Sequence, residues 1–280
     1  MKDKVCLVTG SNSGTGYVTA LELAKTGARV VMLCRNKQKG ETAQNELIHA
    51  SGNSKVDLII ADLAEMHQVR NAVLEFKANY KRLDVLVNNA GGMTGTRKET
   101  SQGLEAMFAG NYLGHYLLTM LLLDELKTTA PARIINVSSL MHKYTTINFD
   151  DLQSVHTFSA MKAYGQTKLA QLLFTYELAG RLQVTGITVN ALHPGVVASG
   201  FKNGVQGVRY VLASIVYKSI GISPAKGAET IVFLATSPEI ASVTGKYFVK
   251  CKARRSSKSS YDVTLRKRLW EETERLLQRY

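Results

Sequence analysis

Short apolar runs alternate with longer amphipathic segments along almost the whole chain. The apolar runs are rich in Val, Ile and Leu, which is typical of strands buried on both faces of a parallel sheet. We expect strands at Val5–Val8, Arg29–Leu33, Lys55–Ile60, Val85–Val87, Arg133–Val137, Thr188–Ala191 and Gly245–Phe248. Apolar positions at helical spacing predict helices at Gly14–Lys25, Lys37–Ala50, Ala64–Tyr80, Ser101–Lys127, Ser159–Leu182, Pro224–Thr236 and Asp262–Gln278. This alternation predicts an α/β fold with a doubly wound parallel sheet of about seven strands and helices on both faces.

The length of 280 residues suits one large α/β domain. We expect this domain at residues 1–250, with a mobile, glycine-containing lid over a ligand at about 196–222, and a C-terminal extension at 251–280. The most apolar stretch, Leu117–Leu126, is too short to span a membrane and contains two acidic residues. With no signal peptide ahead of the first strand, the sequence predicts a cytoplasmic protein. Cys6, Cys34 and Cys251 have no metal-binding or disulfide spacing, so no metal site is expected.

The formal net charge is +13, and the segment from Lys250 to Tyr280 is strongly basic. We expect an exposed loop at Cys251–Ser260, followed by a helix with an apolar stripe that includes Leu269 and Trp270. The charge is compatible with peripheral contact with anionic lipid, or with a solvated surface near an anionic ligand. No nucleic-acid motif accompanies the charge, which favours the solvated surface and argues against a nucleic-acid partner.

A glycine-rich turn, Thr9–Gly16, follows the first strand and begins the first helix. Gly10 permits a tight turn, and Gly14 and Gly16 let the backbone approach a pyrophosphate and the helix approach the sheet. The first N–H groups of the helix would then point at the phosphates. The order strand, turn and helix is the context that a dinucleotide-binding fingerprint requires.

Tyr164 and Lys168 lie one helical turn apart, so their side chains leave the same helix face. A tyrosine has an unperturbed pKa of about 10, and an ammonium one turn away stabilises the phenolate and brings that pKa toward neutrality. An isolated pair of this kind is also found on ordinary solvated helix faces. Ser139, upstream of the pair, and the glycine-rich turn favour a catalytic pair.

Together these motifs resemble those of the short-chain dehydrogenase/reductase family over essentially the whole chain. The turn matches the family's T-G-x-x-x-G-x-G, with Thr15 at a place usually held by an aliphatic residue. Asn88–Gly91 matches its N-N-A-G, and Pro194-Gly195 matches its P-G turn. The resemblance implies a Rossmann-type fold and a catalytic tetrad of Asn111, Ser139, Tyr164 and Lys168. It also implies cofactor contacts at Gly10, Ser11, Asn12, Ser13, Gly14, Thr15, Gly16, Arg35, Asp62, Leu63, Asn89, Ala90, Gly91, Tyr164, Lys168, Pro194, Gly195 and Val197.

A narrower likeness is to the retinol-dehydrogenase-like branch of that family. Asn111–His115, Asn136–Ser139 and His193–Val197 fit this pattern, as does the long insert Met141–Ser159. The branch implies that the C-terminal helix docks beside the substrate pocket. Branch membership is a poor guide to substrate, because pocket loops change while the fold persists.

The end of the second strand indicates which nicotinamide cofactor is preferred. NAD enzymes usually place a carboxylate there, on the ribose hydroxyls. This chain has Cys34-Arg35 instead, and Arg35 can pair with a 2′-phosphate. We therefore expect NADP(H) rather than NAD(H), with Arg35 at the end of a loop as the structural alternative. Asp62-Leu63 is expected against adenine, as the family implies; a helix N-cap is the competing role for Asp62, and the two roles are compatible.

The expected reaction is hydride transfer between the nicotinamide and a carbonyl or alcohol carbon. The resemblance implies that Tyr164 transfers the proton, Ser139 binds the same oxygen, Lys168 supports Tyr164 and the nicotinamide ribose, and Asn111 holds a water that links Lys168 to solvent. Ser138 is the rival for the serine role. Apolar residues in the lid suggest a lipophilic aldehyde, ketone, retinoid or steroid, or a contact in a homo-oligomer.

Two other functions fit the residues less well than an oxidoreductase. A non-catalytic nucleotide-sensing protein would usually lack the tyrosine or the lysine, and an epimerase or dehydratase would carry a different glycine spacing. The histidines at positions 115, 142 and 193 are expected to satisfy local hydrogen bonds.

Overall fold

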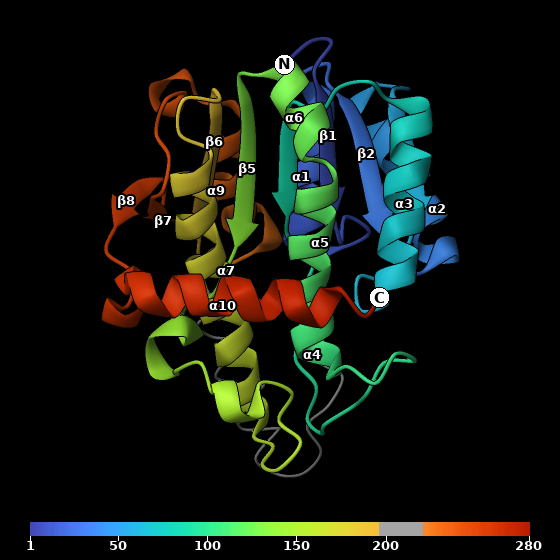
Figure 1. The fold of residues 1–280 in the computed structure, drawn as a ribbon. Helices are drawn as coiled ribbons and strands as arrows, with labels where there is room; N and C mark the ends of the chain where they lie inside the picture. Colours follow the sequence, from blue (N-terminus) through green and yellow to red (C-terminus); the bar gives the residue numbers. More distant parts are fainter. Residues whose placement is uncertain (196–220) are drawn as a thin grey trace.

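A single eight-stranded sheet forms the centre of the molecule, in the order β3-β2-β1-β4-β5-β6-β7-β8 (Figure 1). The computed structural model describes residues 1–195 and 221–280. The strands are β1 (Val5–Thr9), β2 (Arg29–Cys34), β3 (Val56–Ile60), β4 (Val85–Asn88), β5 (Ala132–Val137), β6 (Ile187–Leu192), β7 (Tyr247–Val249) and β8 (Lys252–Arg254). The strands β1 to β7 pair in parallel, and β8 pairs antiparallel with β7. The α/β prediction is confirmed, with one strand more than expected.

Helices cover both faces of this sheet (Figure 1). Along β1, Val5 and Leu7 join one apolar cluster, whereas Cys6 and Val8 join the other, as the two-residue period of a strand requires. One face is covered by α3 (Met66–Asn79), α5 (Gly114–Leu121) and α7 (Ala160–Arg181). The opposite face is covered by α1 (Gly14–Lys25), α2 (Lys37–Ser51) and α9 (Pro224–Thr236). The Ser223 side chain caps α9, with proline in the first turn.

The strand order reverses between β1 and β4, which places the ends of these two strands at the switch point of the sheet. In open α/β sheets a ligand binds outside the carboxyl ends of the strands at this point. Thr9 ends β1 and Asn88 ends β4. The predicted glycine-rich turn and N-N-A-G segment therefore meet at one place.

The helix predicted at Ser101–Lys127 is wrong as a continuous element. The Glu105 carboxylate accepts the N–H groups of Met107 and Phe108, so the helix begins with α4 (Ala106–Phe108). A π-helical turn (Ala109–Leu113) leads into α5, and α6 (Leu123–Thr129) follows. In the described part of the chain, no single helix is long and apolar enough to cross a membrane, and only the bent pair Ala106–Leu121 and Leu123–Thr129 meets that test jointly.

The C-terminal extension packs on the domain, as expected. Its helix, α10 (Val263–Leu277), crosses the outer side of α5 and α7 (Figure 1). Trp270 is buried, and its ring lies 5.1 Å from the ring of Tyr116. The Tyr112 hydroxyl bonds that of Thr273 at 2.8 Å. The loop expected at Cys251–Ser260 is wrong in part, because it contains β8 and the start of a 3₁₀ turn at Lys258–Tyr261.

Candidate active site

The glycine-rich turn folds tightly against the end of β4. Gly10 has a φ of +66°, and a Cβ there would lie 2.9 Å from the Cα of Ala90. A Cβ on Gly16 would lie 2.3 Å from the Gly10 oxygen. These distances exclude a side chain at either position, so glycine is required by the turn itself.

Polar side chains of the turn are used to hold it in place. The Thr9 hydroxyl accepts the N–H groups of Asn89 and Ala90, both at 2.9 Å. The Asn89 amide donates to the Thr9 oxygen at 2.8 Å, and Thr15 donates to the Asn89 Oδ1 at 2.9 Å. Ser11 is buried and donates to the Val8 oxygen. Among the predicted cofactor contacts, Ser11, Thr15 and Asn89 thus shape the turn with their side chains. The polar Thr15, where the family usually has an aliphatic residue, is explained by its bond to Asn89.

The ends of β2 and β3 place Arg35 beside Asp62. The Arg35 side chain is 77% exposed, and its Nη1 lies 3.5 Å from the Asp62 Oδ2. Asp62 Oδ1 accepts the N–H of Ala64, but the N-cap of α3 is Glu65. The helix N-cap role for Asp62 is therefore wrong. Burial raises the pKa of the neighbouring Cys34 thiol, which keeps a neutral side chain at this strand end.

The Lys168 ammonium is buried at the centre of the site. Its Nζ donates to the Val137 oxygen at 3.0 Å and to the Gln171 Oε1 at 2.9 Å. The same atom lies 5.6 Å from the centre of the Tyr164 ring. Burial lowers the pKa of Lys168 to about 7. The structure thus brings the predicted pair together on α7, beside the end of β5.

Asn111 lies within the π-helical turn, opposite Lys168. Its Oδ1 accepts the Gly92 N–H and its Nδ2 donates to the Gly92 oxygen, both at 2.9 Å. Its backbone oxygen accepts the Gln171 amide at 2.8 Å and the His115 Nδ1 at 3.1 Å. A Cβ on Gly91 would lie 3.2 Å from the Lys168 Nζ and 3.4 Å from the Asn111 Oδ1. Gly91 therefore leaves room beside both groups.

The two serines after β5 differ in their surroundings. Ser138 is buried and donates to the Lys168 oxygen at 2.8 Å. The Ser139 Oγ accepts the Met141 N–H at 3.4 Å, and its residue is only partly buried. Ser138 therefore ties β5 to α7, and Ser139 is the serine that can reach a ligand.

The histidines near the site form local hydrogen bonds, as expected. His115 lies between the Asn111 oxygen and the Thr9 hydroxyl, and His142 contacts the Ser139 oxygen at 2.6 Å. His193 Nδ1 accepts the Gly195 N–H. Burial lowers the pKa values of His115 and His193 to about 4, so both rings are neutral at pH 7. Pro194 and Gly195 follow β6 as predicted, and Val197 and most of the predicted lid fall outside the described residues.

The family model for short chain dehydrogenases matches residues 4–207. The chain belongs to the short-chain dehydrogenase family. It is therefore an oxidoreductase of that family, whose members use a nicotinamide dinucleotide.

This short-chain dehydrogenase is similar to retinol dehydrogenases over almost its whole length. It is 40% identical to human (Homo sapiens) retinol dehydrogenase 14, over 98% of this chain and 86% of the relative. It is 41% identical to mouse (Mus musculus) retinol dehydrogenase 12, over 95% of this chain and 84% of the relative. A solved structure of an uncharacterised protein from Mycobacterium paratuberculosis superposes with a TM-score of 0.79 and 29% identity, over 99% of this chain and 94% of that one.

Two polar residues that contact the predicted site, Gln171 and His142, were not predicted from the sequence to belong to it. Gln171 lies three residues after Lys168 on the same helix, so helical spacing could have indicated that the two side chains meet. His142 contacts the Ser139 oxygen through a turn that no periodic pattern predicts.

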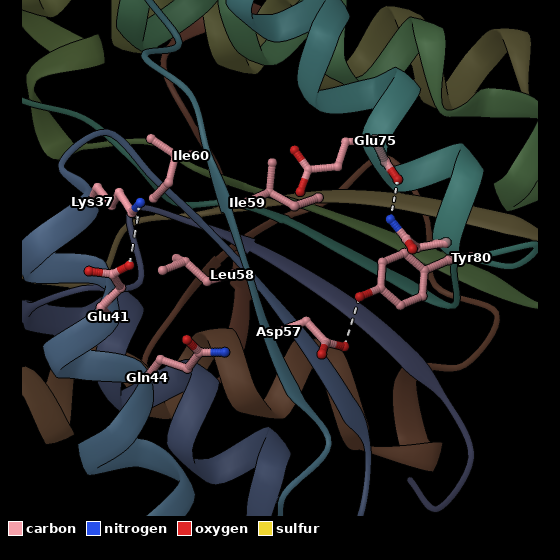
Figure 2. A pocket seen from close by; sticks show the side chains of 10 residues that line it. Lys37, Glu41, Gln44, Asp57, Leu58, Ile59, Ile60, Glu75 and Tyr80 are labelled. Atoms are coloured by element: carbon pink, nitrogen blue, oxygen red, sulfur yellow. Dashed lines mark hydrogen bonds and ion pairs between the residues drawn. The ribbon is translucent and has the colours of Figure 1, made fainter.

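An open cavity at the outer edge of β3 lies away from these residues (Figure 2). It is bounded by α2, β3 and α3, and the Tyr80 hydroxyl donates to Asp57 there at 2.7 Å. None of its lining residues belongs to the predicted site. Within residues 1–195 and 221–280, no group of three or more His, Cys, Asp or Glu residues could hold a metal ion.

Proposed function

We propose that this short-chain dehydrogenase is an NADP(H)-dependent enzyme that interconverts a lipophilic aldehyde or ketone with its alcohol. The observation that carries the proposal is that Lys168 bonds the end of β5 and lies by Tyr164, while Asn111 bonds the segment after β4 and Ser139 follows β5. These four residues come from three different segments, and the buried ammonium of Lys168 lies over the Tyr164 ring. A sensor without catalysis would not require this arrangement.

The residues present fit a bound dinucleotide. Gly10, Gly14 and Gly16 leave the backbone of the turn bare, and Gly14 has a φ of +60°. The N-cap of α1, Ser13, makes no side-chain capping bond to the described residues, which leaves the first N–H groups of the helix for a pyrophosphate. Gly91 leaves space next to Lys168 for a ribose. When bound, the cofactor supplies or accepts the hydride.

The protein groups would then handle the proton and the substrate oxygen. Tyr164 gives its hydroxyl proton to the oxygen during reduction, and Ser139 donates a hydrogen bond to the same oxygen. The charge of Lys168 stabilises the phenolate that forms on Tyr164. Asn111 keeps the Gly92 segment in place through its two amide bonds. In oxidation of the alcohol the same groups act in the reverse direction.

Arg35 supports the preference for NADP(H). Its guanidinium is exposed at the end of β2, and among residues 1–195 and 221–280 its one ion pair is the long contact with Asp62. A 2′-phosphate, with more charge than one carboxylate, can displace this weak partner. The neutral Cys34 beside it adds no repulsion.

The lipophilic substrate class is supported by the exposed apolar side chains in the segment between Ser139 and Tyr164. Leu140, Tyr144, Val155 and Met161 are exposed by 38%, 70%, 62% and 48%. Exposed apolar side chains in this segment can contact an apolar substrate. The relatives named as retinol dehydrogenases support an apolar substrate too.

The test is an NADPH-oxidation screen across aldehydes, ketones and quinones of graded size, with Tyr164→Phe as the control. We expect medium and large apolar carbonyls to react faster than small polar ones. Tyr164→Phe should abolish turnover and retain NADPH binding by fluorescence titration, because only the hydroxyl is lost. Activity of Tyr164→Phe within tenfold of the unaltered enzyme, or activity confined to sugars and hydroxy acids, would contradict the proposal.

A further inference from the structure

The Gln171 side chain connects two members of the proposed tetrad directly. Its Oε1 accepts the Lys168 Nζ at 2.9 Å, and its Nε2 donates to the Asn111 oxygen at 2.8 Å. An ammonium can only donate and a carbonyl oxygen can only accept, so the orientation of the amide is fixed by its partners. Gln171 is 2% exposed, so water does not compete for these bonds.

The groups at both ends of this bridge have a further hydrogen-bond partner each. The Asn111 oxygen also accepts His115 Nδ1 at 3.1 Å, so both of its lone pairs are used. The Val137 oxygen is the second acceptor for Lys168, at 3.0 Å. Loss of the Gln171 amide would leave a buried ammonium with one described acceptor, which is a costly arrangement.

We propose that Gln171 is a positioning residue that holds the Lys168 ammonium beside Tyr164 by anchoring it to the π-helical turn at Asn111. The role rests on the proposed function, since it matters for turnover only if Lys168 supports Tyr164. The family resemblance connects Lys168 and Asn111 through water, whereas here an amide connects them directly. An amide accepts on one atom and donates from another, so Gln171 fixes the position of the ammonium and does not itself pass a proton.

The bridge also controls the charge on Lys168. Burial lowers the pKa of Lys168 to about 7, and each hydrogen bond accepted from the ammonium opposes that effect. The titratable groups that face Lys168 in the described chain are Tyr164 on α7 and His115 on α5. His115 is neutral above pH 5 because its pKa is about 4. A change in the pKa of Lys168 in a Gln171 variant therefore reports on the bridge.

The experiment measures this pKa by ¹³C NMR of lysine enriched at Cε, with the Lys168 signal assigned from its absence in Lys168→Arg. Gln171→Glu keeps the acceptor and adds a negative charge, so the pKa of Lys168 should rise by about one unit or more. Gln171→Met keeps the length of the side chain and removes the acceptor, so the pKa should fall. The pH limit of kcat that depends on Lys168 should move in the same directions, and Gln171→Met should lower kcat by about tenfold or more.

Gln166→Met is the matched control. Gln166 is also buried on α7, but its amide bonds Asn148 and Leu152, outside the tetrad. It should affect stability without moving the pKa of Lys168. An unchanged Lys168 pKa in both Gln171 variants would overturn the inference. The titration needs no turnover, so a moved pKa in a protein that reduces none of the carbonyls tested would support the bridge while refuting the proposed function.

Discussion

The backbone N–H of Ser257 donates to Nε2 of His142 at 3.1 Å. On the other side of the ring, Nδ1 lies 2.6 Å from the Ser139 oxygen, which can only accept, so the proton is on Nδ1. His142 is fully buried, and burial lowers its pKa, which keeps the ring neutral. The imidazole thus joins the C-terminal extension to the backbone of the proposed catalytic serine.

This connection predicts that removal of one backbone N–H in the extension lowers turnover. Ser257 has a φ of −66°, which proline adopts without strain, so Ser257→Pro removes the donor and preserves the backbone angle. We expect kcat to fall about fivefold to tenfold, since a hydrogen bond contributes roughly 1 kcal/mol. Steady-state kinetics with NADPH and an apolar carbonyl would measure the effect.

Ser257→Ala is the control for that experiment, because it keeps the N–H and loses only a hydroxyl. Its kcat should match that of the unaltered enzyme. Equal kcat values for Ser257→Pro and Ser257→Ala would show that the link to His142 has no role in catalysis.

The parts of the site that the sequence predicted are local. Each of these parts is encoded by residues that are neighbours in the chain. This holds for the glycine-rich turn, for the Tyr164–Lys168 pair, and for the end of β1 and the end of β4 taken separately. In contrast, His142 and Ser257 are 115 positions apart in the chain. Because Ser257 contributes its backbone N–H, no pattern of side chains indicates this contact. The sequence predicted that the C-terminal helix docks, but not this contact.

Strand β8 was missed for a different physical reason. The turn between β7 and β8 consists of Lys250 and Cys251, with φ values of +50° and +58°. Two-residue hairpin turns with positive φ normally contain Asn or Gly, and neither occurs here. Similarly, the π-helical turn at Ala109–Leu113 lies within the predicted helix Ser101–Lys127, whose apolar positions gave no indication of a break.

A second prediction separates the two serines after β5. Ser139→Ala should lower kcat by about a hundredfold or more, because it removes a donor to the reacting oxygen, with little change in stability. Ser138→Ala should retain most of kcat and lower the free energy of unfolding by about 0.5–1.5 kcal/mol, because the buried hydrogen bond from the Ser138 hydroxyl to the Lys168 oxygen is lost. Kinetics and urea denaturation of both variants would measure these effects. The opposite assignment, with catalysis lost in Ser138→Ala alone, would exclude Ser139 as the catalytic serine.

A third prediction concerns the cofactor preference. Arg35→Ala should weaken NADPH binding about tenfold to a hundredfold and leave NADH binding nearly unchanged, since a charge-assisted contact contributes about 1.5–3 kcal/mol. Asp62→Asn should strengthen NADPH binding, because it removes the carboxylate that competes for the Arg35 guanidinium. Lys37→Ala serves as the charge-matched control, since Lys37 lies next to a carboxylate of its own helix, that of Glu41. Equal affinities of the unaltered protein for NADPH and NADH would refute the role of Arg35.

The last prediction is that buried histidines make the fold sensitive to mild acid. The pKa values of His115 and His193 are lowered from 6.5 to about 4, mainly by burial. In the unfolded chain these rings take up protons near pH 6.5, whereas in the folded chain they do so only near pH 4. Their contribution is therefore fully present above pH 6.5 and is lost as the pH falls toward 4, by about 2 kcal/mol per histidine at pH 5.

Urea denaturation at pH 7.5 and pH 5 would measure this loss as a fall in the free energy of unfolding. His115→Gln provides the internal comparison, because a residue that does not titrate removes its share of the pH dependence whatever it does to the absolute stability. We expect the difference between the two pH values to shrink by about 2 kcal/mol in that variant. A difference of the same size in His115→Gln and in the unaltered protein would mean that His115 takes up its proton in the folded state, and that its neutral bond to Thr9 does not persist in solution.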